Sequence, residues 1–129
     1  MDIKAVIEAA IAAQSRAYAP YSRFHMGAAV LTTGDTIVTG ALVENVSLGL
    51  AMCAERVALF ATIASGERPT ALVVASPRTN GAITFPCGAC LQVGLELGGR
   101  EMMVVAVAPD GVVERAELGD LLPRGPHKG

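Results

Sequence analysis

The residues best suited to chemistry lie in two short segments. Residues 53–56 read CAER and residues 85–90 read FPCGAC, and together they contain all three cysteines of the chain, Cys53, Cys87 and Cys90. Three thiolates are a sufficient protein ligand set for a zinc ion that keeps an open fourth position. Zinc lowers the pKa of a bound water from about 15.7 toward 7, so hydroxide becomes available at neutral pH. The pattern therefore predicts one catalytic Zn²⁺ per chain.

Glu55 lies two residues after Cys53. A carboxylate beside such a water that does not bind the metal can take up its proton and deliver it elsewhere. A purely structural zinc requires four closed ligands. The chain has no fourth cysteine, and its two histidines are His25 and His127, the latter in the tail. A redox Cys-x-x-Cys pair would leave Cys53 and Glu55 without a role. A catalytic metal site with Glu55 as proton carrier is therefore favoured over both alternatives.

The order of these segments, with APYS at residues 19–22 and VEN at residues 43–45, resembles the small homotetrameric, zinc-dependent cytidine deaminases. The resemblance runs from about Tyr18 to Leu122. It implies hydrolysis of cytidine or 2′-deoxycytidine to uridine or 2′-deoxyuridine and ammonia, as in pyrimidine salvage. It also implies a homotetramer whose active sites lie at the subunit interfaces.

The same resemblance implies roles for four further residues. Phe24 would lie near the pyrimidine ring, Glu44 would bind the ribose 3′-hydroxyl, and the backbone N–H of Ala54 would hold the base. Arg56 would hydrogen-bond the thiolates and offset their negative charge, as groups around a metal's ligands do elsewhere. Three of these residues have a plainer alternative: Phe24 can be ordinary core, Glu44 a solvated loop carboxylate and Arg56 a surface charge.

The chain departs from the family pattern at four positions. Leu42 stands where an asparagine usually contacts the ribose, Leu48 where a tyrosine is usual, and Leu91 where an arginine usually follows the last cysteine. No aromatic residue lies near Pro126, where the family commonly carries one. These changes leave the metal residues intact but alter the surroundings of the substrate. They keep open an alternative substrate, a modified aminopyrimidine nucleoside such as blasticidin S, and, from another class, an inactive zinc-stabilised scaffold.

Composition excludes several other classes. The 129 residues fit a single domain, 1–129, and at 52% hydrophobic but only 4% aromatic they predict an aliphatic core. A net charge of −2, scattered arginines and few aromatics argue against nucleic-acid binding. No stretch of the sequence reaches 18 uninterrupted apolar residues, so no membrane span is expected. The N-terminus does not resemble a signal peptide. Three thiols reserved for a metal fit a reducing cytoplasm.

The elements that must position the metal residues follow from hydrophobic periodicity and from Gly and Pro breaks. We expect helices at 3–17, 52–65 and 88–97, strands at 26–32, 37–42, 71–76, 102–108 and 112–114, a helical turn at 117–122 and a loose tail at 124–129. Both cysteine segments then lie at helix N-termini, where the positive end of the dipole stabilises thiolates. Alternating strands and helices indicate an α/β domain. The resemblance sharpens this to a mixed five-stranded sheet with helices on both faces.

Overall fold

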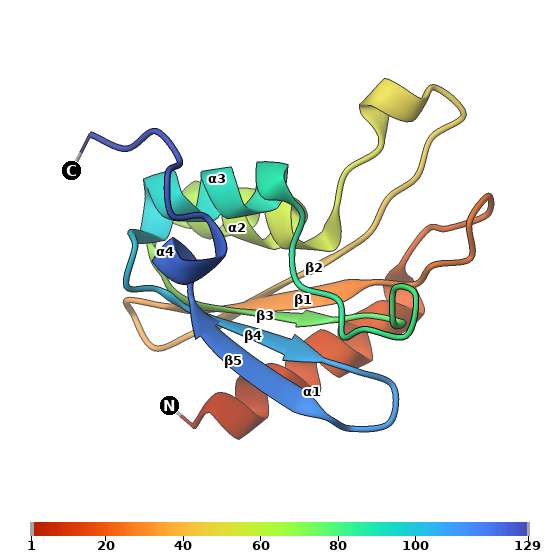
Figure 1. Ribbon diagram of the computed structural model, residues 1–129, viewed down its shortest axis with the longest axis horizontal. Coiled ribbons are helices and arrows are strands. Elements are labelled where there is room, and N and C mark those ends of the chain that lie inside the picture. The colour runs from red at the N-terminus through yellow and green to blue at the C-terminus, as the bar shows by residue number, and fades with distance from the viewer. Residues whose placement is uncertain (1, 129) are drawn as a thin grey trace.

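A five-stranded sheet forms the middle layer of the molecule (Figure 1), which we describe from a computed structural model covering residues 2–128. The strand order is β2-β1-β3-β4-β5. Strands β3 and β4 are parallel, and the other neighbouring pairs are antiparallel. The predicted mixed five-stranded α/β sheet is confirmed. The strands are β1 (Gly27–Thr32), β2 (Ile37–Ala41), β3 (Pro69–Ala75), β4 (Met103–Val107) and β5 (Val113–Glu117).

Helices cover both faces of this sheet. Helix α1 (Ile3–Ala13) lies on one face, and helices α2 (Ala54–Ala64) and α3 (Gly88–Gly98) lie on the other (Figure 1). Successive residues of a strand point to opposite faces, and β3 shows this directly. Leu72 and Val74 join the cluster beneath α2 and α3, whereas Val73 and Ala75 join the cluster beneath α1.

The helices are short. Helices α1, α2 and α3 have 11 residues each, which corresponds to roughly 17 Å at the usual rise per residue. The predicted first helix is correct to Ala13, after which the chain continues as a 3₁₀ turn, Gln14–Arg16. Within residues 2–128, none of the helices has the length and apolar character needed to cross a membrane.

Close packing at Gly40 brings the start of α2 against the sheet. A Cβ atom at Gly40 would lie 2.5 Å from the backbone oxygen of Ala54 and 2.5 Å from the backbone nitrogen of Ala58. Such distances are far inside van der Waals contact, so only glycine fits at this point of β2. The absence of a side chain here therefore fixes how deeply the first turn of α2 sits.

Two expectations for the C-terminal part are wrong in detail. Strand β5 runs from Val113 to Glu117 rather than ending at residue 114, and the helical turn that follows, α4, is Leu118–Leu121. The tail is also less loose than expected, because Gly125 is buried and Gln92 Nε2 donates a hydrogen bond to the Pro126 carbonyl at 2.9 Å. The chain end is thus attached to α3 at least as far as Pro126; Gly129 lies outside the described residues.

Candidate metal centre and active site

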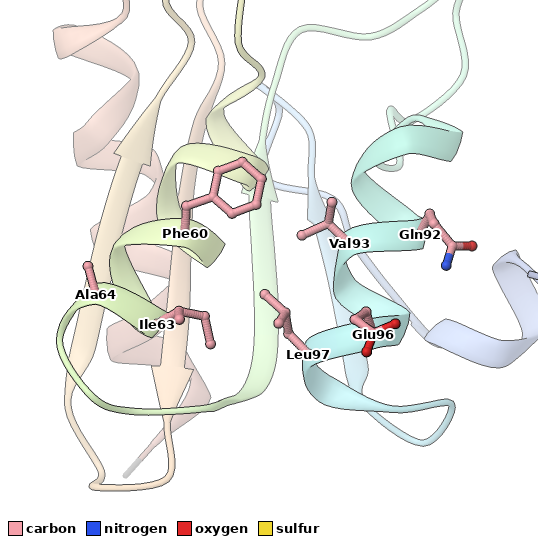
Figure 2. Close-up of a pocket in the computed structure, with 7 residues that line it drawn as sticks. All are labelled: Phe60, Ile63, Ala64, Gln92, Val93, Glu96 and Leu97. Atoms are coloured by element: carbon pink, nitrogen blue, oxygen red, sulfur yellow. The ribbon is translucent and has the colours of Figure 1, made fainter. Parts of the chain in front are cut away.

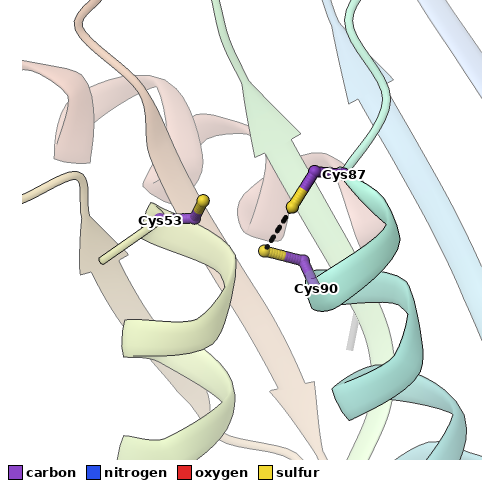
Figure 3. Close-up of side chains that lie close together, drawn as sticks. All are labelled: Cys53, Cys87 and Cys90. Carbon is purple, nitrogen blue, oxygen red and sulfur yellow. Dashed lines mark hydrogen bonds between the residues drawn. The ribbon is translucent and has the colours of Figure 1, made fainter. Parts of the chain in front are cut away.

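The three cysteines meet between the starts of two helices. Cys53 is the N-cap of α2, Cys87 is the N-cap of α3, and Cys90 lies in the first turn of α3. Their sulfur atoms lie within 4.8 Å of one another, and those of Cys87 and Cys90 are 3.6 Å apart (Figure 3). A tetrahedral zinc with Zn–S bonds of about 2.3 Å places its sulfur ligands about 3.8 Å apart. The thiol cluster therefore fits one zinc ion.

The surroundings of the cluster favour ionisation of one of its thiols. Arg56 Nη2 donates a hydrogen bond to Cys53 Sγ at 3.5 Å. A hydrogen bond from the Cys90 thiol, aided by the Arg56 guanidinium, lowers the pKa of Cys53 to about 5. The pKa of Cys90 moves upward, because its thiol is bonded to the Cys53 sulfur and buried. Without metal, Cys53 and Cys90 thus titrate as a pair that favours one thiolate, and metal binding displaces the remaining thiol protons.

Glu55 is buried beside this cluster. Its side chain is 1% exposed, and its Oε1 atom has no hydrogen-bond partner. Burial, reinforced by the charge on Cys53, raises the pKa of Glu55 to about 7 in the metal-free protein. Buried carboxylate oxygens normally have partners. A water or ligand bound at the thiol cluster would supply the one that Oε1 lacks.

A backbone ladder links the cysteine segment to two loops. Val43 and Met52 exchange hydrogen bonds of 3.0 and 2.9 Å, so Met52 lies opposite Val43 and Cys53 follows directly. On its other side Val43 lies beside Tyr18. The Tyr18 N–H donates to the Leu42 carbonyl at 2.8 Å, and the Glu44 N–H donates to the Tyr18 carbonyl at 2.8 Å. The metal residues, loop 43–51 and segment 19–25 are therefore held in fixed register.

Glu44 holds segment 19–25 in place. Its Oε1 accepts hydrogen bonds from the backbone N–H groups of Tyr21 at 3.0 Å and Ser22 at 3.2 Å, and its Oε2 accepts one from the Ser22 hydroxyl. The Ser22 hydroxyl is the main cause that lowers the pKa of Glu44. Glu44 is therefore an ionised carboxylate at neutral pH, bound to the segment that carries Phe24.

Phe24 and Ala54 contact one apolar cluster. Phe24 is half-buried and packs against the core cluster that contains Leu42 and Ala54. Ala54 is the first residue of α2, a position whose N–H has no partner within its helix. Of the expected site residues, Cys53, Glu55 and Arg56 thus lie with the other cysteines, while Phe24 and Glu44 lie together on the adjoining loops.

The four departures from the family pattern have different surroundings. Leu42 is 9% exposed and Leu91 is also buried, both in the core cluster beneath α2 and α3. Leu48 is 85% exposed, in a 3₁₀ turn (Leu48–Leu50) of the loop that projects from the molecule (Figure 1). The backbone of Pro126 is bonded to α3.

One residue of the site was missed from the sequence. Ser22 was recognised only as part of the APYS pattern, yet its hydroxyl also accepts a hydrogen bond from the backbone N–H of Phe24 at 3.0 Å. The available signal was a serine two residues before an aromatic, a spacing at which serine hydroxyls commonly bond the backbone. Its second partner, Glu44, is distant in sequence.

Comparison with known proteins places the chain in a family. The model of the cytidine and deoxycytidylate deaminase zinc-binding region matches residues 1–106. A cytidine deaminase of Halalkalibacterium halodurans is 39% identical over 123 residues, 95% of this chain and 92% of its own. One from Mycobacterium tuberculosis is 44% identical over 111 residues, 86% and 79% respectively. A crystal structure of cytidine deaminase from Burkholderia pseudomallei matches with a TM-score of 0.90 and 46% identity, over 98% of this chain and 100% of that one. The chain belongs to the cytidine and deoxycytidylate deaminase family.

Proposed function

We propose that this enzyme hydrolyses cytidine and 2′-deoxycytidine to uridine or 2′-deoxyuridine and ammonia. The observation that carries the proposal is the cluster of three thiols with a buried carboxyl beside it whose Oε1 lacks a partner. The relatives named above are cytidine deaminases. They favour cytidine over blasticidin S as the substrate.

The chemistry requires one metal ion and one proton carrier. Zinc, when held by Cys53, Cys87 and Cys90, supplies a Lewis acid that brings the pKa of a water into the neutral range. Glu55 would take one proton from the attacking water and deliver it to the ring nitrogen next to the amine-bearing carbon, as the water oxygen bonds to that carbon. Glu55 would then carry the remaining proton of that oxygen to the amine, so that the C–N bond breaks, a C=O bond forms and ammonia leaves. Burial raises the pKa of Glu55 above its ordinary value in the metal-free protein, and a raised pKa suits a carboxyl that must both accept and donate protons.

The remaining site residues bind and orient the substrate. The free N–H of Ala54 at the start of α2 holds the base, and the ring of Phe24 packs beside the pyrimidine. Glu44, ionised and acceptor-only, receives the 3′-hydroxyl of the sugar. Arg56, bonded to Cys53 Sγ, offsets the negative charge of three thiolates.

The oligomer is part of the proposal. We infer a homotetramer in which neighbouring subunits complete each active site. Two apolar surfaces support assembly. The loop beside the site exposes Val46, Leu48 and Leu50, and an apolar groove of about 620 Å³ lies between α2 and α3 (Figure 2), with Phe60 and Leu97 among its lining residues. Exposed apolar patches of this kind mark protein contact surfaces.

The cellular setting follows from the same chemistry. We propose that residues 1–129 act as one deaminase domain in the cytoplasm, where thiol ligands stay reduced, and that the product enters pyrimidine salvage.

A substrate panel tests the proposal. Zinc-loaded protein is incubated with cytidine, 2′-deoxycytidine, free cytosine and blasticidin S, and ammonia release is measured with the change in ultraviolet absorbance. We expect turnover of both nucleosides and much less of free cytosine, which lacks the sugar that Glu44 binds. Turnover of blasticidin S without turnover of cytidine would transfer the assignment to a modified nucleoside. No ammonia from any compound would refute deamination.

A further inference from the structure

Segment 19–25 contains a strained backbone position next to Phe24. Arg23 has a φ of 60°, in the left-handed region that non-glycine residues seldom adopt. The left-handed conformation is disfavoured for an L-residue because its Cβ lies too close to the following carbonyl oxygen. It persists only where surrounding contacts determine it. Here the Arg23 N–H donates to the Ala19 carbonyl at 3.0 Å, and His25 Nδ1 lies 2.9 Å from the Arg23 carbonyl oxygen.

The other contacts of this turn converge on Ser22. Its hydroxyl donates to Glu44 Oε2 and accepts from the backbone N–H of Phe24 at 3.0 Å. A hydroxyl has one donor hydrogen and two acceptor lone pairs, so this one joins two groups in a defined direction. The same hydroxyl therefore sets the orientation of the Glu44 carboxylate and the backbone position of Phe24.

No other side chain duplicates this link within residues 2–128. The remaining hydrogen bonds to Glu44 in this segment come from the backbone N–H groups of Tyr21 and Ser22, and both reach Oε1. Without the Ser22 hydroxyl, Oε2 loses its protein donor, and the carboxylate can rotate about its last bond. The side chain of Ser22 thus controls the oxygen that the backbone does not hold.

A carboxylate has about four acceptor sites, and three are used here. The free one lies on Oε2, beside the bond from Ser22. An ionised carboxylate can only accept, so the group that fills this site must be a donor. A sugar with a free 3′-hydroxyl meets this requirement.

We infer that Ser22 is a positioning residue: it orients Glu44 toward the sugar 3′-hydroxyl and fixes Phe24 beside the base. This inference rests on the proposed function, because it takes the roles of Glu44 and Phe24 from there. Ser22 itself does not touch the reacting atoms.

The test uses two variants of nearly equal shape. Ser22→Thr keeps the hydroxyl, and Ser22→Val replaces it with a methyl group on the same branched frame. Calorimetry measures the affinity of zinc-loaded protein for the product uridine and for its analogue 3′-deoxyuridine, which lacks the 3′-hydroxyl, and steady-state kinetics measures cytidine turnover. The control is Ser65→Ala, which removes a serine hydroxyl bonded to the Thr62 carbonyl at the far end of α2.

We expect Ser22→Val to weaken uridine binding and to raise KM for cytidine roughly tenfold, with a smaller change in kcat, as for loss of a hydrogen bond to a charged group. With 3′-deoxyuridine the loss should fall to about threefold, the part due to Phe24. Ser22→Thr should restore affinity for uridine, and Ser65→Ala should match the parent. The loss of affinity caused by Ser22→Val should therefore be larger for uridine than for 3′-deoxyuridine. A general loss of stability would reduce the affinity for both ligands equally.

Equal behaviour of the Thr and Val variants would overturn the inference. So would an equal loss on both sugars, because Ser22 would then act without Glu44. Zinc content and melting temperature verify folding. Should Ser22→Val fail to fold, Ser22→Ala removes the hydroxyl without added bulk and must show the same sugar dependence. A parent protein that binds uridine but releases no ammonia from cytidine would refute the proposed function, while the calorimetry would still decide the role of Ser22.

Discussion

The carboxyl group of Glu55 is subject to opposing influences. Burial and the nearby Cys53 thiolate favour its protonated form, whereas the Arg56 guanidinium favours the ionised form. The balance leaves its pKa at about 7 in the metal-free protein. A group that is half protonated near neutral pH can carry a proton in either direction. Two predictions follow from this residue, one for turnover and one for stability.

Glu55→Gln should retain zinc and fold but lose nearly all turnover. Glutamine preserves the shape of the side chain and removes its capacity to carry a proton. General acid–base groups contribute about 10²- to 10⁴-fold, so kcat for cytidine should fall by at least a hundredfold, with zinc content unchanged by metal analysis. Turnover within a few-fold of the parent would show that another group moves the proton.

The stability of the chelator-treated protein should depend on pH through Glu55. The pKa of Glu55 in the folded protein, about 7, exceeds the ordinary value of 4.5. The contribution of this shift to the unfolding free energy is therefore fully present below pH 4.5 and is lost as the pH rises through 7. This amounts to about 3 kcal/mol. The unfolding free energy of Glu55→Gln, minus that of the parent, should therefore grow by about this amount between pH 4.5 and 8. The lowered pKa of Cys53 makes the unfolding free energy rise with pH instead. This contribution is present in both proteins, so it largely cancels in the difference between them. Denaturant titrations yielding a constant difference would contradict the prediction.

Leu42→Asn should exchange stability for substrate affinity. Leu42 is buried in an apolar cluster, so an amide there should cost the free enzyme about 1–3 kcal/mol. The family resemblance implies that an asparagine at this position would contact ribose. A neutral hydrogen bond contributes about 0.5–1.5 kcal/mol, so kcat/KM for cytidine should rise roughly two- to tenfold. Leu42→Met, similar in volume and apolar, is the control and should change neither quantity much. A lower kcat/KM for cytidine, with a loss on another aminopyrimidine, would instead show that Leu42 packs against a different substrate.

Two helix starts carry the metal residues, and the sheet beneath determines their separation. The N-cap of α2 is Cys53 and that of α3 is Cys87. Because Cys53 lies on α2 while Cys87 and Cys90 lie on α3, a small shift of either helix changes the distances from the Cys53 sulfur to the other two sulfurs. The site is therefore sensitive to packing at residues that never approach the metal.

Gly40→Ala should demonstrate this sensitivity. The added methyl would meet the backbone of Ala54 and Ala58 at 2.5 Å, so α2 must move away from β2. Overpacking of this kind typically costs 1–3 kcal/mol, and zinc affinity, measured by competition with a chromogenic chelator, should fall with it. Gly49→Ala adds the same methyl where no atom lies within 4 Å and should leave the affinity unchanged. Equal zinc affinity in both variants would disprove the dependence on helix packing.

The sequence predicted the elements whose burial leaves a periodic pattern. Strands β3 and β4 are apolar on both faces because helices cover both, and the cysteine motifs identified the helix starts. The predicted end of strand β5 lies three residues before the observed end at Glu117, because an edge strand paired only with β4 can carry charged residues such as Glu114 and Arg115 without apolar alternation. The bond between Ser22 and Glu44 joins residues 22 apart. It depends on the register between Tyr18 and Val43, and no local pattern encodes that register.

The molecule exposes apolar surface in two places, the projecting loop and the groove between α2 and α3. The projecting loop lies on the same side of the sheet as α2 and α3 (Figure 1). That loop exposes Leu48 and Leu50, and α2 and α3 line the apolar groove. A chain of this size also gains core by association.

Light scattering should therefore show a tetramer of 13.2 kDa chains. Leu48→Glu should shift the population toward smaller species at micromolar concentration, because a charge replaces an apolar side chain that is 85% exposed in the single chain. Glu8→Gln, an exposed change on α1, is the control. A monomeric parent would contradict the proposal. An unaffected Leu48→Glu tetramer would place the contacts elsewhere.

The backbone ladder through Tyr18, Val43 and Met52 has a consequence for how such an enzyme can evolve. Its hydrogen bonds join main-chain atoms alone, so it tolerates exchange of the side chains that project from it. Substrate preference can drift at positions such as Leu42 and Leu48 while the cysteines keep their register. Mutations on the ladder can therefore change the contacts with the substrate while the positions of the cysteines stay the same. A library of variants mutated only at ladder residues should retain metal in most of its members.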